Sequence, residues 1–297
     1  MGPDSAISDL YFDLVAKSVT NAFYQEDYWL TLPAGSSQYA EILADVVGEF
    51  KDHPDFERSM MLAVMTPDRL KGYMTMMGRP CHTMGSIGAV QNVRDLLMSI
   101  IRDEIPGDFI ETGVWRGGLC ILAKAAFTAY GQPDRKVFIA DSFQGLPEPD
   151  RNESLDDAIA YSMARKLNFL AVKRSYVEGL FRQYNLMDDR VHFLEGWFKD
   201  TLPNAPIERL AILRLDGDWY ESTRDSLVNL YEKISPGGYV IIDDYGLPVG
   251  CRRAVDEYRE KHGIEEPIQW VDEAVVFWRK KSVRSTRSPA SPRAEGP

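Results

Sequence analysis

The stretch Asp108-Phe-Ile-Glu-Thr-Gly-Val-Trp-Arg-Gly-Gly118 predicts a short buried strand that runs through a glycine-rich turn into a helix. Four further apolar runs follow, each ending in Gly or Asp, at residues 136–141, 191–196, 210–216 and 239–244. Helical patterns separate them, at residues 117–130, 174–184, 221–234 and 252–262. Strands that alternate with helical crossovers predict an α/β fold with a mostly parallel sheet covered on both faces. A last apolar pair, 268–271 and 274–278, predicts an antiparallel hairpin at one edge.

The regions on either side of this sheet have a different texture. Residues 1–105 show helical patterns at 7–23, 39–50 and 89–104 but no series of strands, so we expect an N-terminal helical cap or lid. An irregular run rich in Met and Gly, from Met65 to Gly88, lies within it. Residues 106–280 hold the predicted sheet. The tail at residues 281–297 has one Val as its only large aliphatic residue, and we expect it to be disordered.

Composition excludes several classes of protein. No apolar run approaches the ~18 residues that cross a membrane. The net charge is −11, and the six Lys or Arg and one Glu from Arg279 onward leave −16 on residues 1–278. Such a surface repels phosphate backbones, so we expect no nucleic-acid partner. The absence of a secretory signal, with only Cys81, Cys120 and Cys251 as cysteines, predicts a cytoplasmic protein.

Two features at the predicted strand ends suit an adenosine cofactor. Gly113 allows a tight turn, and Gly117 and Gly118 let a ligand approach the backbone at a helix N-terminus. Asp141 ends the second strand, 30 residues after Glu111, and a carboxylate in this place binds the two hydroxyls of a ribose. An ordinary strand-to-helix turn and a helix-capping acid are the alternatives at this point.

Four acids follow the next two strands. Asp216 and Asp218 end the fourth predicted strand, and Asp243 and Asp244 end the fifth. Adjacent parallel strands bring these carboxylates together, where they repel one another unless a divalent cation neutralises them. Oxygen donors without a cluster of His or Cys favour Mg²⁺ over Zn²⁺. Helix capping by each acid is the structural alternative.

Five motifs follow the predicted strands: Glu111-Thr-Gly-Val-Trp-Arg-Gly-Gly118, Ala140-Asp-Ser-Phe-Gln-Gly-Leu-Pro147, Glu195-Gly-Trp-Phe-Lys-Asp-Thr-Leu-Pro203, Leu215-Asp-Gly-Asp-Trp-Tyr-Glu-Ser-Thr223 and Ile242-Asp-Asp-Tyr-Gly246. With Tyr11-Phe-Asp-Leu14 and Thr20-Asn-Ala-Phe-Tyr24, they resemble the macrocin/mycinamicin sugar O-methyltransferases of antibiotic biosynthesis. The resemblance covers about residues 9–280 and implies a class I methyltransferase fold with a Rossmann-like sheet. It implies S-adenosyl-L-methionine as the methyl donor bound by residues 106–280, a Mg²⁺ ion, and a glycosylated natural product as the acceptor.

The resemblance also implies individual roles. Its cofactor-binding residues are Thr83, Met84, Glu111, Thr112, Gly113, Val114, Trp115, Arg116, Gly117, Gly118, Asp141, Ser142, Gly196, Trp197 and Asp216. Among them, Asp141 binds the ribose, Gly196 and Trp197 flank the adenine, and Glu111 with the glycines lines the methionine end. Asp216, Asp243 and Asp244 hold the metal, and Asp218 is the general base. Residues 72–80 depart from the family pattern, and the C-terminal tail lies outside the resemblance.

The implied chemistry explains why a metal is useful. The pKa of a sugar hydroxyl lies about 12 units above that of an ordinary carboxylate, which corresponds to roughly 16 kcal/mol and is too much for Asp218 alone. A bound cation lowers this difference by several units. A metal-dependent glycosyltransferase with a D-x-D motif, and a non-catalytic methyltransferase-like binding subunit, remain alternatives. We also expect a homo-oligomer, whereas the acceptor and the methylated hydroxyl are beyond the sequence.

Overall fold

A computed structural model describes residues 3–22, 36–59, 81–149, 155–167, 170–247 and 250–281 of the chain. Seven strands form one sheet in the order β3-β2-β1-β4-β5-β7-β6. Their bounds are β1 Asp108–Thr112, β2 Val137–Asp141, β3 Val191–Glu195, β4 Leu210–Leu215, β5 Ile234–Ile242, β6 Gln269–Trp270 and β7 Val276–Arg279. The first five strands are parallel, and β7 pairs antiparallel with both β5 and β6. The predicted α/β fold with an antiparallel hairpin at its edge is confirmed.

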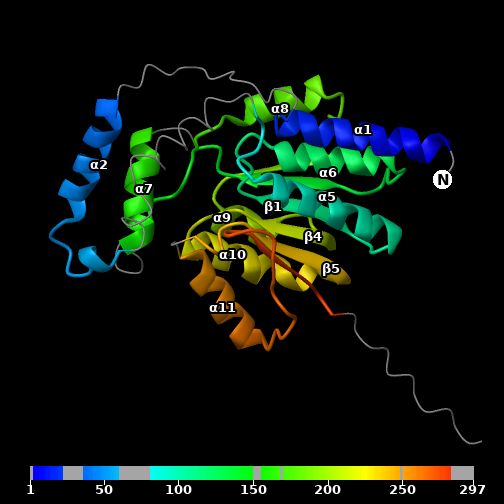
Figure 1. Cartoon of the computed structure of the whole chain (residues 1–297). Helices are drawn as coiled ribbons and strands as arrows, with labels where there is room; N and C mark the ends of the chain where they lie inside the picture. The colour runs from blue at the N-terminus through cyan, green and yellow to red at the C-terminus, as the bar shows by residue number, and fades with distance from the viewer. Residues whose placement is uncertain are drawn as a thin grey trace, which may run out of the picture.

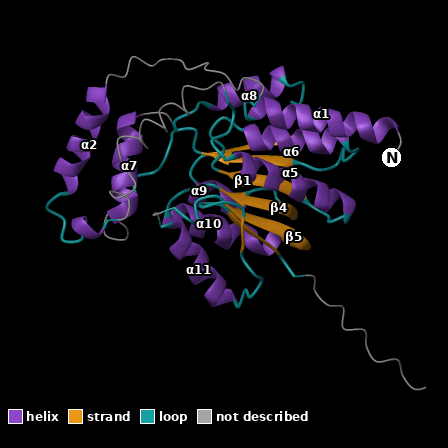
Figure 2. Ribbon diagram, in the orientation of Figure 1, coloured by secondary structure: helices purple, strands orange, loops and turns teal. Residues whose placement is uncertain are grey.

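Helices cover both faces of the sheet (Figures 1 and 2). On one face lie α1 Pro3–Val19, α5 Ile87–Arg102, α6 Gly118–Ala129 and α8 Arg174–Gln183. On the other lie α9 Phe198–Thr201, η2 Leu202–Asn204, α10 Tyr220–Leu230, η3 Tyr231–Lys233 and α11 Cys251–His262. The alternation along β2 shows why: Val137 and Ile139 pack into the first core, and Phe138 and Ala140 into the second. A strand that is buried on both faces must be apolar throughout, as the sequence showed.

The N-terminal region divides between two places. Phe12 of α1 and Leu97 of α5 are fully buried in the same core as the sheet residues, so both helices belong to the layer that covers the sheet. In contrast, α2 Ser36–Phe50 lies away from the sheet beside α7 Leu155–Leu167, at the left of Figure 1, and is followed by η1 Phe56–Arg58. Most of the run from Met65 to Gly88 and nearly all of the tail at 281–297 lie outside the described residues.

Several boundaries differ from their predictions, among them the helix predicted over 7–23, which is Pro3–Val19, and the largest difference in the sheet lies at the start of β5. The helix expected over 221–234 ends at Leu230, and β5 already begins at Ile234, before the Pro236-Gly-Gly238 segment. Pairing with β4 shifts there, because Leu210 aligns with Ile234 whereas Ile212 aligns with Tyr239. The proline and the glycines therefore lie at an irregularity within a long strand. Proline and glycine are tolerated at such irregularities. In the described part of the chain, no helix is both long and apolar enough to cross a membrane.

Candidate functional site

A cavity of about 540 Å³ lies beyond the carboxyl ends of the parallel strands, where ligands bind in open α/β sheets. Eight of the residues predicted from the sequence line it: Met84, Gly113, Trp115, Asp141, Ser142, Trp197, Asp216 and Asp218. The other predicted cofactor residues are not part of the lining: Thr83, Glu111, Thr112, Val114, Arg116, Gly117, Gly118 and Gly196. The structure thus brings the ends of β1, β2 and β4 together around one space.

The glycines of the turn after β1 are required by the protein's own packing. Gly113 has a φ of +89°, and a Cβ there would lie 1.6 Å from the carbonyl oxygen of Asp216. A Cβ on Gly118 would lie 2.5 Å from the carbonyl oxygen of His82, which accepts a hydrogen bond from the Gly118 N–H at 2.9 Å. This reason differs from the ligand approach expected from the sequence. The turn is compressed between the end of β4 and the loop that carries His82.

Asp141 fixes the shape of the donor end of the cavity. Its Oδ2 accepts a hydrogen bond from the backbone N–H of Val114 at 2.8 Å, and its Oδ1 accepts one from Phe143 at 2.7 Å. Burial raises the pKa of this carboxyl, although the backbone donors oppose the shift. The backbone N–H groups of Trp115 and Ser142 act on it in the same way. Asp141 therefore ties the glycine turn to its own loop and, as part of the cavity lining, presents its carboxylate to a bound ligand.

Three strained residues surround the same space. Trp115, Phe143 and Asp218 have φ values of +48°, +56° and +57°, which residues other than glycine rarely adopt. Each lies within three residues of the end of β1, β2 or β4. Such conformations cost on the order of 1–3 kcal/mol each and cluster at functional sites. The strain supports a functional role for this end of the sheet.

The loop at residues 81–86 closes one side of the donor end. The backbone N–H of His82 donates to the Val19 carbonyl at 2.8 Å, which ties the loop to α1. Arg116 donates to the carbonyl of Cys81 at 2.8 Å, and its guanidinium lies 4.2 Å from the ring centre of Trp115. Burial and the nearby Arg116 lower the pKa of His82. These contacts bring Thr83 to the turn and place Met84 in the cavity wall.

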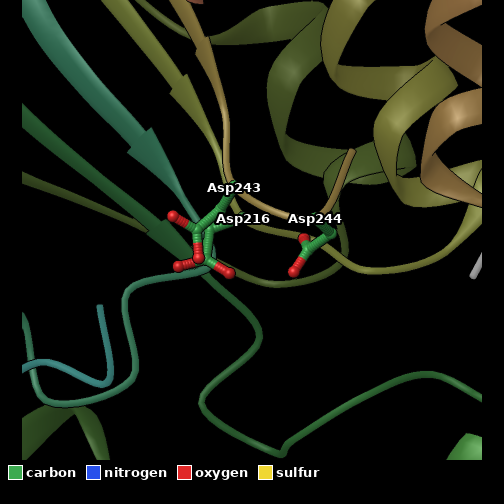
Figure 3. A group of neighbouring side chains, drawn as sticks. All are labelled: Asp216, Asp243 and Asp244. Atoms are coloured by element: carbon green, nitrogen blue, oxygen red, sulfur yellow. The ribbon is translucent and has the colours of Figure 1, made fainter. Parts of the chain in front are cut away.

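Three of the four predicted acids, Asp216, Asp243 and Asp244, come together at one edge of the site (Figure 3). Asp216, Asp243 and Asp244 offer carboxylate oxygens that all lie within 4.8 Å of one another. The sheet places them, because the N–H of Asp216 bonds to Thr112 at 2.8 Å and that of Asp243 bonds to Leu215 at 2.9 Å, beyond the strand ends. Asp218 lies beside them, and its N–H donates to Oδ2 of Asp244 at 3.0 Å.

Sequence reasoning missed a positive charge within this group. Arg214, buried in β4, donates from Nη1 to Glu111 at 2.5 Å and to Asp216 at 2.7 Å, and from Nη2 to Asp243. The acids are therefore partly compensated, contrary to our expectation. The signal was present in the sequence: an arginine in an otherwise apolar strand, two residues before an acid, points to the same side as that acid.

Carboxyl groups still outnumber the single guanidinium around Arg214. Glu111, Asp216, Asp218, Asp243 and Asp244 give five carboxyl groups for one guanidinium. Burial, together with neighbouring acids, raises the pKa of Asp243 to about 7 and that of Asp218 to about 8. Burial and the same neighbours raise the pKa of Asp244 well above its usual range. The site therefore favours the binding of positive charge.

The remaining wall was not singled out from the sequence. It consists of Gly145, Leu146, Pro147, Glu148, Pro149, Leu170, Phe198, Lys199, Gly217, Trp219, Glu221, Ser222, Arg224 and Asp225. Trp219 joins two parts of this wall, because its indole N–H donates to the carbonyl of Pro147 at 3.0 Å. Several of these residues lie in the quoted motifs at 140–147 and 215–223, which was the available signal.

Residues 8–280 match the family model for macrocin-O-methyltransferase (TylF). The chain belongs to this family. It is 38% identical over 283 residues to mycinamicin III 3''-O-methyltransferase from Micromonospora griseorubida, covering 95% of this chain and all of that protein. It is 40% identical over 275 residues to 8-demethyl-8-(2,3-dimethoxy-alpha-L-rhamnosyl)-tetracenomycin-C 4'-O-methyltransferase from Streptomyces olivaceus, covering 91% and 92% of the two chains.

Solved structures agree with the family. The O-methyltransferase NovP aligns with a TM-score of 0.71 and 38% identity, covering 92% of this chain and 99% of that one. The protein is therefore an S-adenosylmethionine-dependent O-methyltransferase with the class I methyltransferase fold, as the sequence predicted. Family membership decides against the D-x-D glycosyltransferase and the non-catalytic binding subunit.

Proposed function

We propose that this O-methyltransferase methylates a hydroxyl of a sugar or deoxysugar that is attached to a natural product. We also propose that the enzyme uses a Mg²⁺ ion held by Asp216, Asp243 and Asp244. The observation that carries the proposal is the group of three carboxylates at the edge of a cavity that also contains the donor-side residues. The names of the relatives support the acceptor class, because one of them acts on a rhamnosyl group of a tetracenomycin.

On the donor side, the cavity offers what S-adenosylmethionine requires. We assign the ribose hydroxyls to Asp141, whose carboxylate is held in the cavity lining by backbone hydrogen bonds. Trp197 supplies an apolar surface for the adenine, and Met84 and Gly113 border the methionine end. Glu111 is buried, and its carboxylate accepts hydrogen bonds from Arg214 and from Cys120 Sγ, the latter at 2.9 Å. We therefore assign it a supporting role at the donor end.

The donor set fits a magnesium ion. All three candidate ligands are carboxylates, and hard oxygen donors without a sulfur or imidazole ligand are typical of Mg²⁺ sites. The carboxyl groups that outnumber the guanidinium of Arg214 are held partly protonated by burial and by one another, and a cation favours their ionised form. When bound, such an ion supplies Lewis-acid chemistry that makes a nearby hydroxyl more acidic.

We assign removal of the proton of the acceptor hydroxyl to Asp218. It lines the cavity next to the metal candidates without belonging to their group. Its pKa of about 8 reduces the difference from an alcohol, near ~15.7, to about 8 units, compared with about 12 for an ordinary carboxylate. A raised pKa of this kind makes the carboxylate a stronger base.

A direct assay tests the proposal. The protein is incubated with S-adenosylmethionine and either a glycosylated macrolide or the matching aglycone, with Mg²⁺ or with excess EDTA, and the products are analysed by mass spectrometry. We expect one added methyl group, on the sugar, only with the glycoside and the metal. Methylation of the aglycone contradicts the acceptor class, whereas full activity in EDTA contradicts the metal.

A further inference from the structure

Arg214 occupies the centre of the site without facing the cavity. It lies on β4, between β1 and β5, in register with Glu111 on one side and Ile241 on the other. Because alternate residues of a strand point to the same face, its side chain extends toward Asp216, two residues further on. Its side chain is 1% exposed and that of Glu111 is 4% exposed, so the pair lies behind the cavity wall.

The guanidinium contacts two metal-ligand candidates through different nitrogens. Nη1 donates to Oδ2 of Asp216 at 2.7 Å, and Nη2 donates to Oδ1 of Asp243. These two acids follow different strands, and Figure 3 shows their carboxylates side by side with Asp244 further along the edge. Nη1 also bonds to Glu111 at 2.5 Å, which anchors the guanidinium to β1. Each bridged aspartate keeps one oxygen that Arg214 does not bind.

We propose that Arg214 is a positioning residue of the metal site, which holds one oxygen of Asp216 and one of Asp243 and thereby directs the other oxygens toward a divalent cation. This inference rests on the metal of the proposed function. The arginine is expected to keep these contacts when the ion binds. Groups that orient metal ligands in this way typically change metal affinity or activity 10–100-fold when they are lost.

The alternative is that Arg214 only supplies positive charge to a group of buried acids. The two roles have opposite consequences for metal binding, because loss of a neighbouring positive charge by itself strengthens the binding of a cation. A lysine keeps the charge but has a single nitrogen, so it does not reproduce the planar, two-nitrogen bridge. Arg214→Lys therefore separates geometry from charge.

The first experiment measures Mn²⁺ and Mg²⁺ binding to Arg214→Lys and to the wild-type protein by titration calorimetry, beside the affinity for S-adenosylmethionine and the melting temperature in EDTA. We expect at least a tenfold loss of metal affinity and a much smaller change in donor affinity. The matched control is Arg135→Lys. Arg135 also bridges two acceptors, the carbonyls of Gly107 and Ile105, but at the opposite ends of the strands. It should lose thermal stability without losing metal affinity.

The second experiment uses the unmodified chain and does not depend on the folding of a variant. In protein labelled with ¹⁵N-arginine, the buried guanidinium should give separate, slowly exchanging Nη–H signals without metal. These signals should persist with Mg²⁺ and be broadened by Mn²⁺, more than those of Arg135. Their loss on addition of Mg²⁺ would show that the ion displaces the arginine, and would overturn the inference.

The outcomes separate the inference from the proposed function. Wild-type protein that binds neither ion contradicts the metal, and with it the role of Arg214. Wild-type protein that binds metal, with equal affinity in Arg214→Lys, refutes the positioning role alone. If Arg214→Lys loses no more affinity for the metal than for S-adenosylmethionine, Arg214 supports the structure in general. This outcome also refutes the positioning role.

Discussion

Asp218→Asn should reduce activity and increase the stability of the metal-free protein. The pKa of Asp218 is raised to about 8 in the folded protein from an ordinary value of 3.8. Between these values the unfolded chain is ionised while the folded protein holds a proton, so stability falls as pH rises from about 4 to about 8 and is constant above that. At pH 7 the difference of about 3 units corresponds to at most about 4 kcal/mol of destabilisation.

The expected size follows from this upper limit. Partial exposure of Asp218 to the cavity reduces the effect to about 1–3 kcal/mol, and one kcal/mol raises the melting temperature of a chain of this size by about 2–4 °C. Asparagine resembles the protonated acid, and the backbone N–H of residue 218 still reaches Asp244. We therefore expect the melting temperature to increase by about 2–12 °C in EDTA above pH 8 and to change little near pH 4.

Two measurements on the same variant check this reasoning. Calorimetric melting in EDTA at pH 5, 7 and 9 should show a gain that grows with pH. The methyl-transfer rate should fall by ~10²–10⁴-fold, the usual contribution of a positioned base. Asp103→Asn is the control of opposite sign, because Arg102 and Arg279 lower the pKa of Asp103 far from the cavity. The reasoning is refuted if Asp218→Asn gains the same stability at every pH, or retains wild-type activity.

Three further predictions concern the other parts of the site. Asp216→Asn should lose both metal affinity and methyl-transfer rate, whereas Asp218→Asn should keep its affinity for Mg²⁺. If added Mg²⁺ restores the activity of the Asp218 variant but not that of the Asp216 variant, the roles of base and metal ligand are reversed. Asp141→Ala should weaken S-adenosylmethionine binding strongly in titration calorimetry, because it removes the ribose acceptor and two backbone hydrogen bonds, and unchanged affinity contradicts the assignment. Light scattering should show a homo-oligomer, in keeping with Ile7, Leu10 and Leu14 exposed along α1, and a monomer at all concentrations contradicts this expectation.

The sheet could be predicted because its local signals agree with its packing. Val137-Phe-Ile-Ala140 is apolar at every position, and the structure buries the four side chains on alternating faces. The strand predicted from residue 239 begins earlier, at Ile234, and the Pro and Gly residues at 236–238 gave no local sign of this because they are typical of turns. Only the pairing of Ile234 with Leu210 shows that the strand continues through them. That pairing is a contact between distant segments, which local sequence does not contain.

The site shows the same limit at the level of single residues. Spacing from strand ends was enough to bring Asp216, Asp243 and Asp244 together, because neighbouring parallel strands end at one edge. It did not reveal that Gly118 is required by the carbonyl of His82, 36 residues earlier in the chain, or that Trp219 joins the wall at Pro147. Such contacts depend on how loops cross one another above the sheet.

Several residues that the fold accommodates at a cost lie at the proposed site. Trp115, Phe143 and Asp218 have left-handed backbone there, held by the packing around it. Burial of the acids around Arg214, together with their mutual repulsion, raises the pKa of Asp218 and Asp243. A cation that binds only the folded protein relieves this repulsion and stabilises the fold by RT ln(1 + [L]/Kd). Because Arg214 supplies a single positive charge among five carboxyl groups and binds three of them, it can order the ligands without neutralising the whole group, which leaves carboxyl groups that a metal ion can bind in their ionised form.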